Sequence, residues 1–518
     1  MIERLLDRLK VWHIIICSAV VYILATTSTL SMSGDDATYI LISRAFAEKG
    51  FFGYIFSPAY TSSTLYNFLM PLLLAPFSAI APEGYLWMKF IPILSSVLAA
   101  IALNLFLKGS ISDRYRKAIV LLFALNPWIV EYSGLILTEM PFIASSLCAA
   151  AYAKKYDESG KGVYLIILVV STASAVYLRP FGLAFIPAIA LFFGMRKKYG
   201  ELAVMAAALI VMLLPALYSA HKIFTVILRE SIMRQELYSA SYKGSSPADA
   251  LYRAGYNLTV YIGNYLPDIL MRPIVFGIYP RLADGSVNTI FIPKFMLGSA
   301  ASLIMARGFV KTAYARIQLY HLYVIFYIAL TMLVNVYVAR YLLPLLPFLL
   351  FFFFSGIPGE DPPRANAEPA HHRWREYVPA ASFAALFLIS VVGVTAITLD
   401  ARMGNIRPEA KSFIECNDWI KANTPRASVI LSRKPSYTKL YTGRTVVGYF
   451  CSEDPDAQLE FIKKLKPDYV IVGDLDFFPH TAGALKEAAR RHPGIFSLVY
   501  ETKEEPIDYV YKVTVDRQ

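Results

Sequence analysis

Long apolar runs recur through residues 11–399, separated by short polar connections. A helix needs about 20 mostly apolar residues to cross the hydrocarbon core of a bilayer, and several of these runs approach that length. Hydrophobic residues make up 56% of the chain, above the roughly 45–50% of soluble domains. We therefore predict a polytopic α-helical membrane protein with about eleven transmembrane helices. The predicted spans lie near 11–30, 86–106, 118–132, 135–153, 163–177, 181–195, 202–220, 290–306, 319–338, 341–357 and 378–399.

Basic residues predict how the chain is oriented in the membrane. The formal net charge is +12, and clusters of Lys and Arg recur in every second connection between the apolar runs. The positive-inside rule assigns these connections to the cytoplasm. The N-terminus is thus predicted to be cytoplasmic, and the segment after residue 399 to be extracytoplasmic, in a multi-pass plasma-membrane protein. The same pattern assigns the positive charge to contacts with membrane lipids, not nucleic acid. The basic connections are 108–117, 154–161, 196–198, 307–316 and 364–375.

Three segments near the N-terminus need separate assignments. The run 11–30 resembles a signal peptide, but its length and the lack of a clear small-residue cleavage site predict a retained transmembrane helix. Segment 65–80 contains Pro71 and Pro76, and a crossing there would invert every later loop. We predict that it lies along the outer interface or re-enters it. Residues 37–49 have apolar side chains at helical spacing and are predicted as an amphipathic helix on the outer surface.

Three segments are predicted to lie on the outer side. Two of them, 31–64 and 221–289, are loops of a transmembrane domain that comprises residues 1–399. The third, 400–518, alternates helix-like and strand-like runs and predicts a separate small α/β domain. This domain contains Cys416 and Cys451, which can form a disulfide in an oxidising compartment.

The predicted topology brings ionisable residues from distant parts of the chain to the outer face. Ionised groups at this depth are costly unless they are solvated, paired or functional. A carboxylate there can take a proton from an attacking hydroxyl, and a guanidinium can hold a departing phosphate. Such a set suits glycosyl transfer from a donor that a lipid phosphate anchors. The residues are Asp35, Asp36, Glu139, Arg179 and Arg340.

Each of these residues also has a purely structural interpretation. The two aspartates can cap helix 37–49, because acids at a helix N-terminus interact favourably with the helix dipole. Glu139 can simply open the helix that contains Pro141. The two arginines can be interfacial residues that extend toward lipid headgroups. The sequence alone leaves both interpretations open.

The order of short motifs resembles the GT-C superfamily of glycosyltransferases that use lipid-phosphate sugars. The resemblance is to protein O-mannosyltransferases and lipid A aminoarabinose transferases in particular. It covers the first two thirds of the chain and rests on the order of the motifs, none of which is specific alone. The motifs are Gly34-Asp35-Asp36-Ala37-Thr38-Tyr39, the Pro-containing segment 66–77, Asn126-Pro127, Thr138-Glu139-Met140-Pro141, Leu178-Arg179-Pro180-Phe181-Gly182 and Arg340-Tyr341-Leu342-Leu343-Pro344.

The resemblance implies an inverting enzyme that moves a sugar from a polyprenyl-phosphate donor to a hydroxyl of a lipid, glycan or protein acceptor. It implies that Asp35 is the general base, and that Asp36 and Glu139 orient the acceptor or Asp35. No cofactor is implied. The implied donor phosphate-binding residues are Arg179, Arg340 and Tyr341.

Two alternatives stay open. Segment 416–425 resembles the outer domains of oligosaccharyltransferase catalytic subunits, although their Trp-Trp-Asp-Tyr-Gly motif is missing and residues 431–435 stand near its place. An enzyme of that type would transfer a larger glycan with a divalent cation, for which Asp35, Asp36 and Glu139 can offer oxygen ligands. We predict no metal site. The other alternative is a transporter or scaffold, but the internal repeats and mid-membrane acids typical of transporters are not found.

Overall fold

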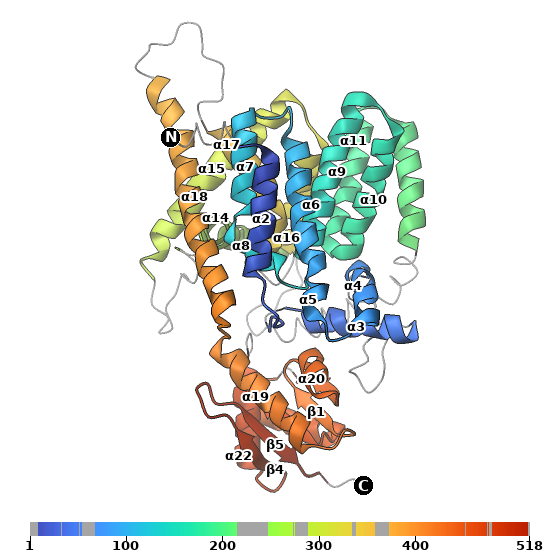
Figure 1. Cartoon of the computed structure of the whole chain (residues 1–518), viewed down its shortest axis with the longest axis vertical. Helices are drawn as coiled ribbons and strands as arrows, with labels where there is room; N and C mark the ends of the chain where they lie inside the picture. The colour runs from blue at the N-terminus through green and yellow to red at the C-terminus, as the bar shows by residue number, and fades with distance from the viewer. Residues whose placement is uncertain are drawn as a thin grey trace.

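The computed structural model describes residues 9–32, 34–50, 52–53, 68–214, 247–272, 274, 288–333, 338–357, 372–450, 452–473, 475 and 479–515. It has two parts, a bundle of long helices and a small domain that contains a sheet (Figure 1). Helix α3 (Asp36–Lys49) lies across the end of the bundle that faces the small domain. We call this end of the bundle the α3 end.

Each predicted span contains a helix. The bundle consists of α2 (Val11–Ala25), α5 (Tyr85–Met88) with α6 (Phe90–Leu107), α7 (Asp113–Ala124), α8 (Pro127–Ser133), α9 (Glu139–Ser159), α10 (Gly162–Leu178), η1 (Pro180–Ala184) with α11 (Phe185–Met195), a helix over Tyr199–Leu214, α13 (Pro247–Val260), η2 (Tyr261–Tyr265), α14 (Leu266–Met271), α15 (Phe291–Ala315), α16 (Leu319–Leu333), η3 (Ala339–Tyr341), η4 (Leu343–Leu345), α17 (Leu346–Gly356) and α18 (His372–Met403).

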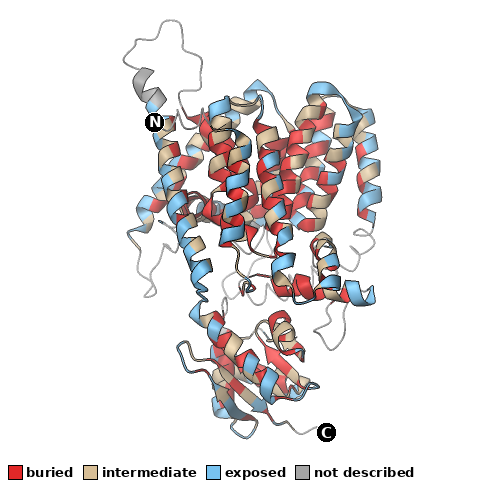
Figure 2. Ribbon diagram, viewed as in Figure 1, coloured by how far each residue is buried: buried red, intermediate tan, exposed pale blue. Residues whose placement is uncertain are grey.

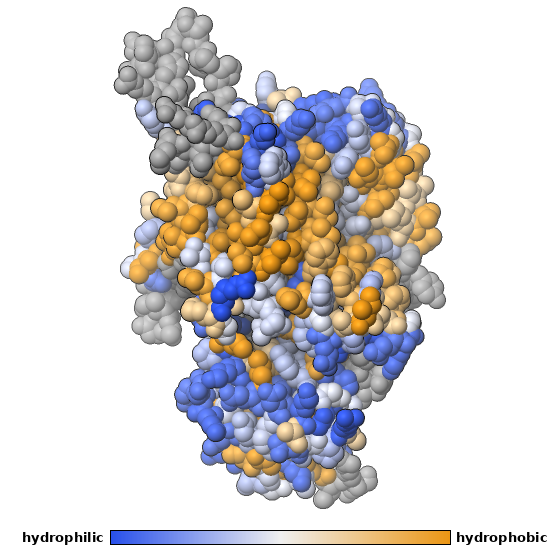
Figure 3. Space-filling view, viewed as in Figure 1, coloured by the Kyte–Doolittle hydropathy of each residue, from blue (hydrophilic) through white to orange (hydrophobic). Residues whose placement is uncertain are grey.

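Within the described residues, three helical stretches are long and apolar enough to cross a membrane, namely Tyr85–Leu107, Ala339–Gly356 and Tyr377–Asn423. Six shorter apolar helices accompany them. The surface of the bundle carries an apolar belt between two polar zones (Figure 3), to which exposed residues such as Trp12, Ile16 and Val20 on α2 contribute. A belt of this kind suits lipid contact. A helical membrane protein is therefore supported, while the total of about eleven spans stays a prediction.

The predicted span 118–132 is not one continuous helix. It divides at Asn126, where the side chain accepts a 3.0 Å hydrogen bond from the backbone N–H of Trp128 and so caps α8. Pro127 then occupies the first helical position, where its missing N–H costs nothing. The break starts a short helix at the α3 end.

Four of the turns predicted to be cytoplasmic lie within the described residues, at the end of the bundle opposite α3 (Figure 1), namely 108–117, 154–161, 196–198 and 307–316. Lys154 donates to the carbonyl oxygen of Lys108 at 2.6 Å, which joins two of these turns. Asp157 forms ion pairs with both Arg196 and Arg316 at 2.8 Å, which joins the next two. The charge pattern therefore grouped the connections correctly, and the side of the membrane that they face stays a prediction.

Helix α3 forms where an amphipathic surface helix was predicted. It runs across the end of the bundle (Figure 1). Helix α4 (Leu69–Ile80) packs against it, and the Ser43 and Ser78 hydroxyls share a 2.5 Å hydrogen bond. With 12 residues, Pro76 among them, α4 is shorter than the roughly 20 residues of a membrane span. This agrees with the prediction that segment 65–80 does not cross; residues 65–67 lie outside the described residues.

The described part of the predicted outer loop 221–289 is helical. Segments α13, η2 and α14 pack against α15 and α16 instead of extending from the bundle. Asp268 on α14 forms a buried 2.7 Å ion pair with Lys294 on α15. The Asn257 side chain donates to the carbonyl oxygen of Met332 at 3.0 Å. Residues 221–246, 273 and 275–287 of this loop lie outside the described residues, as do residues 33, 51 and 54–64 of the loop 31–64.

The C-terminal domain has the predicted α/β pattern. Its elements are α19 (Pro408–Asn423), β1 (Val429–Ser432), α20 (Pro435–Thr442), β2 (Thr445–Gly448), α21 (Pro455–Leu465), β3 (Tyr469–Val472), α22 (Pro479–Arg491), β4 (Phe496–Glu501) and β5 (Tyr509–Val513). The strand order is β2-β1-β3-β5-β4. Strand β1 pairs in parallel with β2 and β3, whereas β5 is antiparallel to β3 and β4.

Two details of this domain differ from the sequence prediction or leave it untested. Helix α20 was not predicted, and it is the element nearest to α3. Cys416 is a buried free thiol on α19, and Cys451 lies outside the described residues. The disulfide between them therefore stays a prediction.

Helices α15 and α17 approach closely because each has a glycine at the crossing. A Cβ atom on Gly308 would lie 1.8 Å from the carbonyl oxygen of Phe352, and one on Gly356 would lie 2.0 Å from that of Ile304. Small residues at helix crossings let backbones pack closely in membranes. The buried residues of the bundle lie along the helices in its interior (Figure 2).

We expect Gly308→Ala to destabilise the protein by about 1–3 kcal/mol, because the added methyl group must push α15 and α17 apart. Thermal unfolding in one detergent measures the effect. The control is Gly194→Ala on α11, where nothing lies within 4 Å of an added Cβ. It should leave the melting temperature unchanged or raise it slightly. Equal melting temperatures for the two variants would contradict the close crossing.

Candidate active site

Four of the predicted charged residues meet at the α3 end of the bundle. Glu139 is the first residue of α9, Arg179 caps the end of α10, Arg340 lies in η3, and Asp35 precedes α3. Glu139 is close enough to interact electrostatically with both arginines. Arg340 also interacts with Asp35. The fold thus forms one cluster from residues that are far apart in the sequence.

Glu139 and Arg179 form a buried ion pair. The Arg179 Nη1 atom lies 2.5 Å from Oε1 of Glu139, and the two side chains are 8% and 2% exposed. Arg179 also donates to the Thr138 hydroxyl at 3.4 Å. An arginine held in this way does not extend toward headgroups, so the interfacial interpretation of Arg179 is wrong. Breaking such a buried pair costs several kcal/mol, because it leaves an uncompensated charge.

Tyr341 joins Arg340 to this pair. The guanidinium carbons of Arg179 and Arg340 each lie 5.8 Å from the centre of the Tyr341 ring. The Tyr341 backbone is fixed in turn by the Tyr327 hydroxyl, which donates to its carbonyl oxygen at 2.8 Å. Two positive charges around one aromatic ring are mutually repulsive, and both gain from a nearby anion. In this structure Glu139 and Asp35 supply the nearby negative charge, since both interact with Arg340.

Asp35 occupies the N-cap position of α3 but does not cap it through its side chain. No side-chain capping hydrogen bond is formed, although the Asp35 carbonyl accepts from the N–H of Tyr39 at 3.0 Å. Asp35 is half-buried. Tyr39 interacts electrostatically with Asp35, Glu139 and Arg179, and burial raises the pKa of its hydroxyl. Asp35 is thus a half-buried carboxylate at the cluster, and its side chain does not cap the helix.

Asp36 is oriented differently from Asp35. It is fully buried, with 0% exposure. Its Oδ2 accepts from the backbone N–H of Ser31 at 3.4 Å, and its Oδ1 lies 3.4 Å from the Tyr437 hydroxyl, which donates to it. A Cβ on Gly34 would lie 2.6 Å from the same Oδ1. The structure therefore places Asp36 in a packed contact, and not with its carboxyl open to a substrate.

Sequence reasoning missed Lys89, which lies close to Asp36. The Lys89 ammonium group is buried and donates to the carbonyl oxygens of Thr27 and Thr29, at 2.7 Å each. Lys89 falls inside the apolar run 86–106. A lone ionisable residue in such a run indicates a pairing or functional role. That signal was present in the sequence.

Burial raises the pKa of Asp36 to about 7, well above the roughly 3.9 of an exposed aspartate. Between these values the folded protein holds a proton that the unfolded chain has lost, so the free energy of unfolding should fall as pH rises through this window. Asp36→Asn should abolish the contribution of this carboxyl to the decrease in the free energy of unfolding with rising pH. Melting temperatures from acid to mildly alkaline pH measure it, with Glu83→Gln, exposed at the same end, as control. An identical pH profile for wild type and Asp36→Asn would refute this assignment.

The three carboxylates considered as cation ligands do not converge. Glu139 pairs with Arg179, and Asp36 is enclosed by Ser31 and Tyr437. In the part of the chain that the structure describes, no group of three or more His, Cys, Asp or Glu residues is placed to hold a metal ion. These residues, in this arrangement, do not fit a shared cation site.

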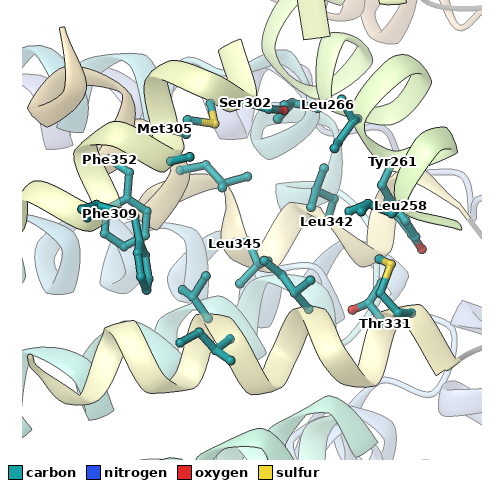
Figure 4. A pocket seen from close by; sticks show the side chains of 18 residues that line it. Leu258, Tyr261, Leu266, Ser302, Met305, Phe309, Thr331, Leu342, Leu345 and Phe352 are labelled. Atoms are coloured by element: carbon teal, nitrogen blue, oxygen red, sulfur yellow. The ribbon is translucent and has the colours of Figure 1, made fainter. Parts of the chain in front are cut away.

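An apolar cavity of about 370 Å³ lies beside the cluster, between α13, η2, α15, α16 and the η4–α17 segment. Its lining includes Tyr261, Leu266, Leu342 and Leu345, with Phe309 and Phe352 at the other end (Figure 4). Leu342 follows Tyr341 directly in the chain, and Tyr261 interacts electrostatically with Tyr341. The cavity therefore lies against the segment that directly follows Arg340 and Tyr341 in the chain.

Solved structures with the same fold are glycosyl-transferring membrane proteins. ArnT from Cupriavidus metallidurans, bound to undecaprenyl phosphate, matches with a TM-score of 0.58 at 12% identity, over 97% of this chain and 97% of its own. The oligosaccharyltransferase AglB from Archaeoglobus fulgidus, in complex with an inhibitory peptide and a dolichol-phosphate, matches with a TM-score of 0.54 at 12% identity, over 96% of this chain and 74% of its own. An AglB complex with Zn and sulfate has a TM-score of 0.54 at 14% identity, over 88% and 67%.

No family model matches the chain, and no curated protein matches it. The likeness to ArnT, a lipid A aminoarabinose transferase, and to AglB is one of fold, and both proteins are members of the GT-C superfamily. The fold that the motif resemblance implies is therefore found, and at 12–14% identity the likeness is one of fold alone.

Proposed function

We propose that the chain is an inverting glycosyltransferase that moves one sugar from a polyprenyl-phosphate donor to an acceptor hydroxyl. The observation that carries the proposal is the half-buried Asp35, which interacts with Arg340 in a cluster that also contains Glu139 and Arg179. The fold supports glycosyl transfer from lipid-linked donors in general. The acceptor is a lipid, glycan or protein, and this part of the proposal rests on the motif resemblance alone.

The donor would bind with its tail in the cavity and its phosphate at the arginines. The cavity lining is almost wholly apolar, as an isoprenoid chain requires. Arg340 is half-buried and lies near Tyr341. Both residues directly precede Leu342, which lines the cavity. Arg179 is already neutralised in part by Glu139. Arg340 is therefore the main phosphate ligand in this proposal, and Arg179 a second positive charge.

The chemistry follows from these positions. The acceptor oxygen attacks the anomeric carbon while Asp35 takes its proton. The bond between that carbon and the phosphate oxygen breaks, and its electron pair leaves with the phosphate. Arg340 and Arg179 stabilise the growing negative charge. Attack opposite the leaving group inverts the anomeric centre, and polyprenyl phosphate is released. Glu139 holds Arg179 in place, and Asp36 supports the turn that carries Asp35.

The reaction is proposed for the outer face of the plasma membrane. The catalytic part comprises residues 1–399, with a cytoplasmic N-terminus and the α3 end outside. Domain 400–518 is then extracytoplasmic. The support is the clustering of the basic turns at the end opposite α3, as the positive-inside rule requires.

Asp35→Asn should lower kcat for sugar transfer by about 100-fold or more, since an amide cannot accept the proton. Donor affinity should change little, because Arg340 and the cavity are intact. Purified protein in nanodiscs, labelled polyprenyl-phosphate sugars and membrane acceptors provide the assay. The matched control is Glu48→Gln, an exposed acid at the other end of α3. Full activity of Asp35→Asn would place the base elsewhere.

The second candidate is an oligosaccharyltransferase-like transfer of a larger glycan with a divalent cation. The fold of AglB, which has been solved with Zn and with an acceptor peptide, favours it. The carboxylate arrangement described above does not. A chelator separates the two candidates. We expect full transfer of a single sugar in excess EDTA. Loss of transfer that Mn²⁺ or Mg²⁺ restores would instead support the second candidate.

A further inference from the structure

The C-terminal domain contacts the bundle through the short helix α20, which packs against α3. The hydroxyls of Ser436 and Thr38 share a 2.7 Å hydrogen bond, and the Tyr437 hydroxyl donates to Asp36. All four residues are buried, and Tyr437 is only 2% exposed. A second connection is covalent, since α18 of the bundle leads into α19 of the domain. The α20 contact therefore fixes the domain against α3.

The same contact continues into the bundle. Asp36 accepts from Ser31 on its other oxygen and interacts with Lys89, which in turn holds the carbonyls of Thr27 and Thr29. The first turn of α3 is thus held between α20 on one side and the 27–31 segment on the other. Asp35 is the residue that enters this turn, and its own side chain forms no capping bond. Its position therefore depends on the contacts of its neighbours.

We propose that Tyr437 and Ser436 are positioning residues of the active site. By holding Asp36 and Thr38, they fix the first turn of α3 and so aim the Asp35 carboxylate at the acceptor. The inference rests on the proposed function and deepens it, because it makes the C-terminal domain part of the catalytic apparatus instead of a cover. Displacements of about 1 Å at a reacting group can cost roughly 100-fold in rate.

The first test compares Tyr437→Phe with Tyr511→Phe, a matched change on β5 of the same domain. Tyr437→Phe should lower kcat about tenfold while KM for the donor changes less than about twofold, since only the orientation of the base is affected. Tyr511→Phe should behave as wild type. Combining Tyr437→Phe with Asp36→Asn should cost less than the product of the two single effects, because both remove one contact. Unchanged kcat in Tyr437→Phe, or a loss confined to KM, would overturn the proposal.

The second test does not depend on activity for its first readout. Thr38→Cys combined with Ser436→Cys should form a disulfide under mild oxidation, since the native oxygens lie 2.7 Å apart. The cross-linked protein should keep the activity of its reduced form. Failure to cross-link, or activity that returns only on reduction, would overturn the proposal. If the pair cross-links but wild type transfers no sugar from any donor, α20 docks on α3 as described, while the proposed function fails and the catalytic role of Tyr437 fails with it.

Discussion

The buried ion pair between Glu139 and Arg179 is the interaction on which the arrangement of the site depends. It links the start of α9 to the end of α10, two helices that pack along their length. Neither charge is stable alone at this depth. Once paired, they hold Arg179 near Tyr341, and Tyr341 brings Arg340 to the same place. We infer that the two arginines, next to the segment that lines the apolar cavity, receive the phosphate of a lipid-linked donor.

The two neighbouring aspartates, Asp35 and Asp36, have different surroundings and, we infer, different roles. Because α3 lies across the end of the bundle, consecutive residues at its start face different surroundings. Asp36 turns into a packed contact with Ser31, Lys89 and α20, and Asp35 stays half-buried beside the arginines. The packed Asp36 carboxylate and the half-buried Asp35 carboxylate therefore suit different roles. We infer that Asp35 reacts and that Asp36 keeps it in position, with the C-terminal domain as a third support.

Much of the architecture was predictable because a bilayer restricts the chain. Apolar runs and basic turns gave the helices and their grouping, and strand periodicity gave the C-terminal sheet. The same alternation of basic and other turns predicted that four charged residues lie at one end of the bundle, namely Asp35, Glu139, Arg179 and Arg340. The features that the sequence did not predict depend on tertiary contacts. Asn126 and Pro127 break a run that is continuous in apolarity. Helix α20 is short and polar, and its role depends on a residue about 400 positions earlier. The different surroundings of Asp35 and Asp36 also arise from tertiary contacts, which the sequence pattern does not show.

The most direct measurement is a cryo-electron microscopy structure of the protein in nanodiscs with a bound polyprenyl-phosphate sugar. We predict that the isoprenoid tail lies in the cavity lined by Leu342 and Leu345, that the phosphate contacts Arg340, and that the anomeric carbon faces Asp35 across a gap that an acceptor oxygen can fill. A donor phosphate bound away from both arginines, or a sugar bound on the far side of α3 from Asp35, would contradict this arrangement of the site.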